Sequence, residues 1–365
     1  MIDSQLIIFE GLPSTGKTTN ARFIHIQLER NNINAKWIHE IANPHPLSFF
    51  DEAGLTHDEY TGFIEKYPKA ADILNNIAVF KKSTVGISFP EIEWNYLDII
   101  GDDVYQALLK FDAWDFSVDV HKKFALEKWA HFTEKALKNR DRVYIVDSAF
   151  FQFQIFTFLF ENKPYDELQN FINQITEIIQ PLKPCLFYLY RDNTEATIDY
   201  LEKNRGTSYL EYIWQRDKNQ PYYTSRPPGV ETFKQFLRDY ADMADLLYKS
   251  FPAKKISLNI SDENWGYHED KMLSFLDINR IQDPDTSPQN GVYKNEALGF
   301  VITVDGLSIT DPNGNIRPLF LKTHNEYYVD WIPTILRFEN KKIIIKGSQT
   351  SSRWTTTGMI YNKIG

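Results

Sequence analysis

One segment near the start of the sequence has the residue types and spacing to bind phosphate. It reads Gly-Leu-Pro-Ser-Thr-Gly-Lys-Thr over residues 11–18, which fits the pattern G-x-x-x-x-G-K-[ST] in full. Glycines let such a loop wrap closely around phosphate, while successive N–H groups and the start of the following helix supply partial positive charge. The segment therefore predicts binding of a nucleoside triphosphate, either ATP or GTP.

Each residue of this loop has an expected role. Lys17 is expected to reach the β- and γ-phosphates as a catalytic residue, and the hydroxyl of Thr18 is expected to bind Mg²⁺. The remaining nucleotide-binding residues that we predict are Gly11, Ser14, Thr15, Gly16 and Thr19.

Two carboxylates end apolar runs that read as strands. Asp147 ends the run Arg142–Asp147, where we predict a catalytic acid that holds or orients hydrated magnesium and that, like Glu40, is a candidate to orient the acceptor; the alternative is an ordinary strand-end aspartate that caps the next helix. Glu40 ends the run Ala35–Glu40, at the edge where open α/β sheets bind ligands. We predict that Glu40 accepts a proton from an attacking hydroxyl; the alternative is an ordinary surface glutamate.

Arginines follow the fourth apolar run. Residues 203–229 mix them with Asn, Gly, Pro and Tyr, which predicts a mobile basic lid that closes over a triphosphate. Of these arginines, Arg205 and Arg216 are the expected catalytic residues, whereas solvated surface arginine is the simpler interpretation of the others. His39, His45 and His121 lack metal-ligand spacing, and we assign them no role.

The elements that position these residues alternate between two patterns. Short continuous apolar runs suit parallel strands that are covered on both faces. Amphipathic stripes between them, such as Lys17–Arg30 and Tyr165–Gln180, predict helices. The expected fold is a doubly wound α/β domain with a parallel sheet of at least five strands, which are Gln5–Glu10, Ala35–Glu40, Arg142–Asp147, Cys185–Tyr190 and Lys255–Ile260.

The sequence also predicts a division into domains. Residues 1–280 form the α/β domain, in which residues 44–138 are too long for a simple connection and are expected to be a helical insertion on the substrate side. Residues 281–291, rich in Pro, Asp, Ser and Asn, read as a linker. Residues 292–365 show alternating apolar runs and hairpin turn signals, which predict a small antiparallel β domain.

Composition limits the classes of function. A net charge of -9 and a pI of about 5.5 make nucleic acid an unexpected partner. The single cysteine, Cys185, allows neither an internal disulfide nor a thiolate zinc cluster, which favours a cytoplasmic location. No segment predicts a signal peptide or a membrane partner, because the most apolar stretch, Phe150–Phe160, is too short to span a bilayer. A homodimer is an open possibility.

Together these features resemble the P-loop nucleoside and nucleotide kinases, the group that includes thymidylate and deoxynucleoside kinases. The resemblance covers residues 2–278 and rests on the loop, Glu40, the IVDS sequence at Ile145–Ser148 and the segment Tyr188–Gly206. It implies that Glu40 activates a substrate hydroxyl, that Asp147 is the acid of an Asp-Arg pair, and that Arg205 is a lid arginine. Ser148 stands where that family has the arginine.

The expected activity is transfer of the γ-phosphoryl group of ATP to a hydroxyl of a small acceptor. Between Arg30 and Arg140 there is no arginine, and Pro44–Val120 holds fourteen Asp or Glu against five Lys. Such a segment would repel a second phosphate, so we predict a neutral or cationic acceptor, such as a nucleoside or an amino-bearing molecule. Alternatives are a nucleoside monophosphate kinase, an enzyme that inactivates an antibiotic-like molecule, and an NTPase switch that acts on a partner through the β domain.

Overall fold

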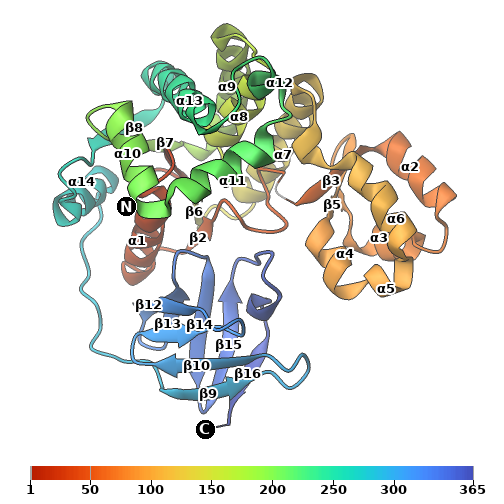
Figure 1. Cartoon of the computed structure of the whole chain (residues 1–365). Coiled ribbons are helices and arrows are strands. Elements are labelled where there is room, and N and C mark those ends of the chain that lie inside the picture. Colours follow the sequence, from red (N-terminus) through yellow and green to blue (C-terminus); the bar gives the residue numbers. More distant parts are fainter. Residues whose placement is uncertain (1, 50, 365) are drawn as a thin grey trace.

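The computed structural model describes residues 2–49 and 51–364. Its central sheet has five parallel strands in the order β2-β6-β1-β7-β8 (Figure 1). The five apolar runs all form strands, which confirms the predicted parallel sheet. Their bounds are β1 Leu6–Gly11, β2 Ala35–Ile38, β6 Val143–Asp147, β7 Cys185–Tyr190 and β8 Lys254–Asn259.

Both faces of the sheet are buried, as continuous apolar strands require. In β1, Leu6 and Ile8 join the core on one face, while Ile7 and Phe9 join the core on the other. The first core includes α7 (Val118–Leu137), α8 (Gln152–Phe160), α9 (Tyr165–Ile179) and α13 (Val230–Ser250). The second core includes α1 (Lys17–Arg30) and α14 (Trp265–Leu276).

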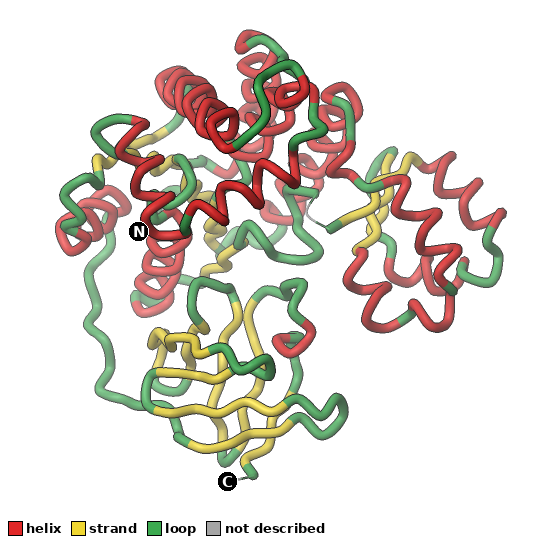
Figure 2. The backbone as a smooth tube through the Cα atoms, in the orientation of Figure 1, coloured by secondary structure: helices red, strands yellow, loops and turns green. Residues whose placement is uncertain are grey.

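The insertion is not purely helical, which corrects the prediction for residues 44–138. Residues 52–111 form an arm with its own apolar core and a three-stranded antiparallel sheet in the order β3-β5-β4, at the end of the arm nearest the body (Figure 2), whereas α7 belongs to the core of the body. These strands are short, and β4 has only two residues, so no alternating pattern marked them. The elements are β3 Glu52–Thr56, α2 His57–Lys66, α3 Ala71–Ile77, β4 Val79–Phe80, β5 Thr84–Ser88, α4 Phe89–Asn95, α5 Leu97–Ile100, α6 Asp102–Leu108, η1 Leu109–Phe111 and η2 Ala113–Asp115.

The predicted lid is also different from the expected loop. Most of residues 203–229 is helical, because Leu210 and Ile213 supply an apolar stripe that is buried against the core of the body. After η3 (Gln180–Leu182) and β7, this part of the chain consists of α10 Thr194–Arg205, α11 Thr207–Asp217 and α12 Pro221–Thr224.

The C-terminal part is a closed antiparallel barrel of eight strands, which confirms the predicted β domain. The turn signals at Gly306, Gly314 and Asn340 all fall between neighbouring strands of the barrel. The first strand begins at Gly291, one residue before the predicted start. The elements are β9 Gly291–Lys294, β10 Val301–Asp305, β11 Ser308–Thr310, β12 Ile316–Thr323, β13 Glu326–Val329, β14 Thr334–Glu339, β15 Lys342–Gly347, η4 Arg353–Thr355 and β16 Ile360–Lys363.

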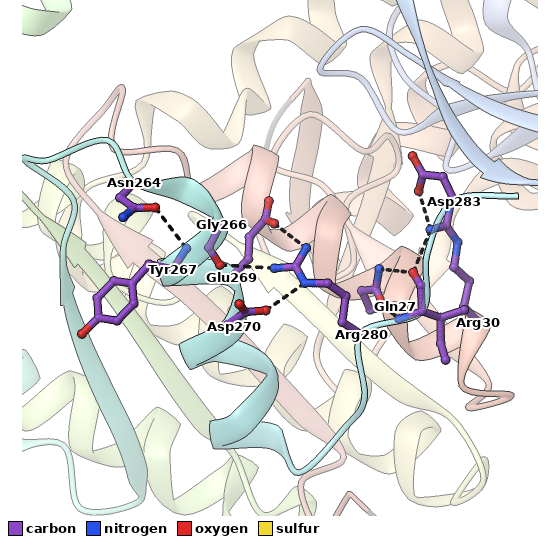
Figure 3. A network of polar contacts seen from close by, with 10 residues as sticks. Gln27, Arg30, Asn264, Gly266, Tyr267, Glu269, Asp270, Arg280 and Asp283 are labelled. Atoms are coloured by element: carbon purple, nitrogen blue, oxygen red, sulfur yellow. Dashed lines mark hydrogen bonds and ion pairs between the residues drawn. The ribbon is translucent and has the colours of Figure 1, made fainter. Parts of the chain in front are cut away.

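The connection between α14 and the barrel has no regular structure, but it is held to the body at its start (Figure 3). Arg280 donates to Glu269 and Asp270 of α14. The backbone N–H of Ile281 donates to the side-chain oxygen of Gln27 on α1, and the Ile281 carbonyl accepts from the side-chain nitrogen of the same residue. The other end is held to the barrel, where Thr286 contacts the Tyr327 hydroxyl, Gln289 accepts from Tyr293 and Asn290 accepts from Gly306. Within the described part of the chain, no helix is long and apolar enough to cross a membrane.

Candidate functional site

The loop between β1 and α1 depends on two glycines. Gly11 has φ 145° and Gly16 has φ 82°. A Cβ at Gly11 would lie 2.2 Å from the carbonyl oxygen of Leu189, and one at Gly16 would lie 2.9 Å from the Trp265 ring. Only residues without a side chain fit these two places, so the sequence allows the backbone to make this tight turn. Ser14 completes the turn with φ 64°.

The start of α1 supplies hydrogen-bond donors to this loop. The first helical hydrogen bond runs from the Asn20 N–H to the Gly16 carbonyl, at 3.0 Å. The N–H groups of Lys17, Thr18 and Thr19 therefore have no partner inside the helix and can bind an anion. Thr15 acts differently, because its hydroxyl is buried and donates to the Leu12 carbonyl at 2.7 Å, which fixes the shape of the loop.

Lys17 is buried beside the loop. Its Nζ donates to the carbonyl oxygens of Gly11 and Leu12, both at 2.9 Å. Burial lowers the pKa of Lys17, while the nearby carboxylates of Glu40, Glu10 and Asp147 raise it. The pKa of Lys17 is lowered on balance, because burial is the largest of these effects.

Asp147 and Thr18, the two predicted magnesium ligands, are neighbours. Asp147 Oδ1 accepts from Trp37 Nε1 at 3.3 Å, while Oδ2 is buried without a hydrogen-bond partner among the described residues. Burial raises the pKa of Asp147, and His39, the Thr18 hydroxyl and Trp37 lower it.

These atoms fit a hydrated magnesium ion. An unpartnered buried carboxylate oxygen next to a hydroxyl is a donor set that Mg²⁺ prefers, since it keeps several waters and uses few protein ligands. No group of three or more His, Cys, Asp or Glu in the described ranges is arranged to hold a metal by itself. A site made by this chain alone would therefore be incomplete and would need phosphate oxygens to finish it.

Glu40 lies two residues beyond β2 and is half-buried. Its Oε2 accepts a long hydrogen bond of 3.4 Å from Gln152 at the start of α8. Its charge acts on both Lys17 and Asp147. The structure therefore brings Lys17, Thr18, Glu40 and Asp147 together, although 107 residues separate the last two in sequence.

Glu10 is a further member of the site that the sequence analysis missed. Its Oε1 accepts from the N–H groups of Phe150 and Phe151, both at 2.8 Å, and Oε2 is buried without a partner among the described residues. Burial raises the pKa of Glu10 to about 7, against the effect of these donors and Lys17. A charged residue inside an otherwise apolar strand was the signal available for it.

Ser148 also has a special conformation. It follows Asp147 with φ 62°, and its buried hydroxyl has no hydrogen-bond partner within the described residues. Glu10, Asp147 and Ser148 thus each have one buried polar atom without a hydrogen-bond partner among the described residues, at the ends of neighbouring strands. Such an atom lowers the stability of the folded protein unless a ligand or a water molecule binds it.

The predicted catalytic arginines lie in two different environments. Arg205 ends α10, stacks over the Tyr209 ring at 4.8 Å and acts electrostatically on Lys17. Arg216 makes two hydrogen bonds of 2.7 Å to Asp217 and lies 5.0 Å from the Trp114 ring. Its contacts belong to the helical lid and an aromatic pocket, not to the phosphate loop.

That aromatic pocket has a volume of about 400 Å³. It lies between the N-terminal part of α7, α8, η2 and α12, and includes Asp115, Glu161 and His121. Burial lowers the pKa of His121 to about 4, so its ring is neutral near pH 7. The aromatic lining residues are Phe49, Trp114, Phe116, Phe153, Phe156 and Phe160.

Comparison with known proteins adds no family to these observations. No protein-family model matches the sequence, and no curated protein matches it.

Proposed function

We propose that this chain is an ATP- and magnesium-dependent phosphotransferase that acts on a hydroxyl of a small acceptor. The observation that carries the proposal is the position of Lys17, whose ammonium lies beside a glycine loop and among the carboxylates of Glu10, Glu40 and Asp147. A lysine, a helix start and carboxylates at one sheet edge are the parts that phosphoryl transfer requires.

The chain has groups to hold the triphosphate of ATP and its magnesium ion. The free N–H groups at the start of α1 would bind phosphate oxygens, and Lys17 would exchange the Gly11 and Leu12 carbonyls for the β- and γ-phosphates. Thr18 and Asp147 would hold magnesium, which neutralises negative charge on the phosphates when bound. Arg205 would add positive charge from the lid.

Glu40 would then act on the acceptor. The acceptor oxygen attacks the γ-phosphorus, the bond to the bridging oxygen breaks, and ADP leaves. The hydroxyl proton passes to Glu40, which is half-buried and held by one long hydrogen bond. Most of the catalysis would come from positioning and electrostatics.

The aromatic pocket is the proposed acceptor site. Phe156 of this pocket contacts the Tyr240 ring at 5.9 Å, and the Tyr240 hydroxyl donates to the Gly11 carbonyl at 3.4 Å. The Tyr240 side chain therefore connects Phe156 of the pocket with the loop at Gly11. Its lining within the described residues has no Lys or Arg and includes two carboxylates, which favours a flat neutral or cationic acceptor.

The test is transfer of labelled phosphate from ATP to paired acceptors, each nucleoside beside its monophosphate, together with a set of hydroxylated amines. We expect transfer to an acceptor without phosphate, and a fall of about 10³- to 10⁵-fold in a folded Lys17→Ala variant, because the charge contact to the phosphates is lost. Preference for a monophosphate would contradict the acceptor class. Hydrolysis without transfer to any acceptor would favour an NTPase switch.

A further inference from the structure

The segment from Trp37 to Asn43, which carries Glu40, contacts the barrel through every second residue. Trp37 packs edge-on against Tyr328, with ring centroids 5.6 Å apart. The Trp37 carbonyl also accepts from Ser348 Oγ at 3.2 Å. The barrel thus contacts part of the free edge of the outermost strand, and a cavity of about 710 Å³ lies between the rest of β2 and the barrel.

The next odd-numbered residues continue this contact. The His39 ring lies 5.6 Å from the Trp331 ring. Ile41 packs against the core of the barrel itself. The Asn43 N–H donates to the Gln349 carbonyl at 2.8 Å.

Two even-numbered residues of the segment contact the body. Ile38 joins the core under the sheet, and Glu40 accepts from Gln152 near Lys17. Because β2 is the edge strand, only β6 pairs with it within the described sheet. The segment is therefore held by the body on one side, through β6 and α8, and by the barrel on the other.

His39 links the two sides most directly. Its Nδ1 accepts from the Ile41 N–H at 3.1 Å, which fixes the ring beside the turn that carries Glu40. The ring contacts Trp331 on the barrel and also packs against the Trp37 ring, with centroids 5.0 Å apart. Trp37 Nε1 in turn donates to Asp147 Oδ1 at 3.3 Å, so His39 links the barrel to the carboxylates of the site through ring contacts.

We propose that the barrel positions the site: Trp331, through His39 and the turn at Glu40 and Ile41, holds the Glu40 carboxylate at its place near Lys17. This inference rests on the proposed function for the role of Glu40. Trp331 is a positioning residue and touches no substrate.

Trp331 can be replaced without unfolding the barrel, because its side chain is largely at the surface. Trp331 is 46% exposed, so Trp331→Ala leaves no closed cavity. A matched control is Leu307→Ala, because Leu307 is 57% exposed in the turn between β10 and β11.

The first measurement is amide hydrogen exchange on the full chain without ligand. The N–H groups of Ile41, Ala42 and Asn43 are all hydrogen-bonded, to His39 Nδ1, to the His39 carbonyl and to Gln349. In Trp331→Ala we expect these amides to exchange about tenfold faster or more, while those of β1 stay unchanged. Unchanged exchange at residues 41–43, or equal acceleration in Leu307→Ala, would overturn the proposal.

The second measurement is a double-mutant cycle on phosphoryl transfer. Trp331→Ala should lower transfer about tenfold or more in the wild-type background, since small misplacements of reacting groups are costly. It should lower transfer no further in Glu40→Gln. Independent, multiplicative losses would contradict positioning through Glu40. An absence of transfer in the wild type would contradict the proposed function instead, and the exchange result would still decide the structural claim.

Discussion

At the scale of single residues, the buried Glu10 carboxyl links protonation to stability. Burial raises its pKa from an ordinary value of 4.5 to about 7. Between these two values the folded chain keeps a proton that the unfolded chain has lost. This difference in proton binding contributes to the free energy of unfolding. The contribution is complete below about pH 4.5 and is lost as the pH rises through about 7, which lowers the free energy of unfolding by up to about 3 kcal/mol.

Glu10→Gln should remove this part of the pH dependence. The amide oxygen can still accept from Phe150 and Phe151, but no charge has to be buried at high pH. Urea unfolding at about pH 5.5 and about pH 8 should show a smaller difference in the variant than in the wild type. Glu211→Gln, at an exposed position, is the control and should keep the wild-type difference. Equal differences in all three proteins would show that Glu10 does not titrate in this range.

At the scale of elements, Lys128 of α7 joins the loop after β2 to the first strand of the arm. Its Nζ donates to the carboxylate of Glu52 on β3, to the His45 carbonyl at 3.0 Å and to the Ser48 carbonyl at 2.5 Å. The ammonium also lies 4.6 Å from the Phe49 ring, which lines the aromatic pocket. The buried Lys128 thus fixes the position of Phe49, one of the residues that line the proposed acceptor site.

Lys128→Met should destabilise the protein by about 3–5 kcal/mol, because it leaves a buried carboxylate and two carbonyl groups without their donor. Lys81, 3.8 Å from Glu52, offsets part of this loss. Chemical denaturation measures the effect, with Lys123→Met on the exposed face of the same helix as the control, expected within about 0.5 kcal/mol of wild type. Equal stability of both variants would mean that the ion pair contributes nothing.

At the scale of the whole molecule, the barrel has its own core but is also bound to the body. The Tyr328 hydroxyl donates to His25 Nδ1 at 2.5 Å, and Tyr328 and Ile335 join the core beside α1. Arg22 stacks over the Phe320 ring and donates to the Asp330 carbonyl. These contacts do not depend on the linker, so they should survive its cleavage.

We therefore expect a single cut in the linker to leave the two parts together. A protease that cleaves after acidic residues should cut at the exposed Asp285 before Asp283, which precedes Pro284 and whose carboxylate pairs with Arg30 at 2.6 Å. The fragments should co-elute in gel filtration and separate only in denaturant. Release of the barrel under native conditions would show that the interface is weaker than its contacts indicate.

The sequence by itself determined the parts that depend on local pattern. The five apolar runs, the helix at Lys17–Arg30 and the glycine loop are each encoded within a few residues, because burial on both faces and a tight turn with positive φ require particular residue types. The hairpin turns of the barrel were predictable for the same reason. Short strands such as β4 lacked a pattern long enough to be recognised.

Only the tertiary structure decided which distant residues meet. Glu10 is one charged residue in an apolar strand, and its contact with the backbone of Phe150 and Phe151 exists only because β1 and β6 are neighbours. Arg216 pairs with Asp217 and lies over the Trp114 ring, whereas Arg205 acts electrostatically on Lys17. The contact of the barrel with the Glu40 segment joins residues about 300 apart, and burial against a distant partner leaves no periodic signal in either segment.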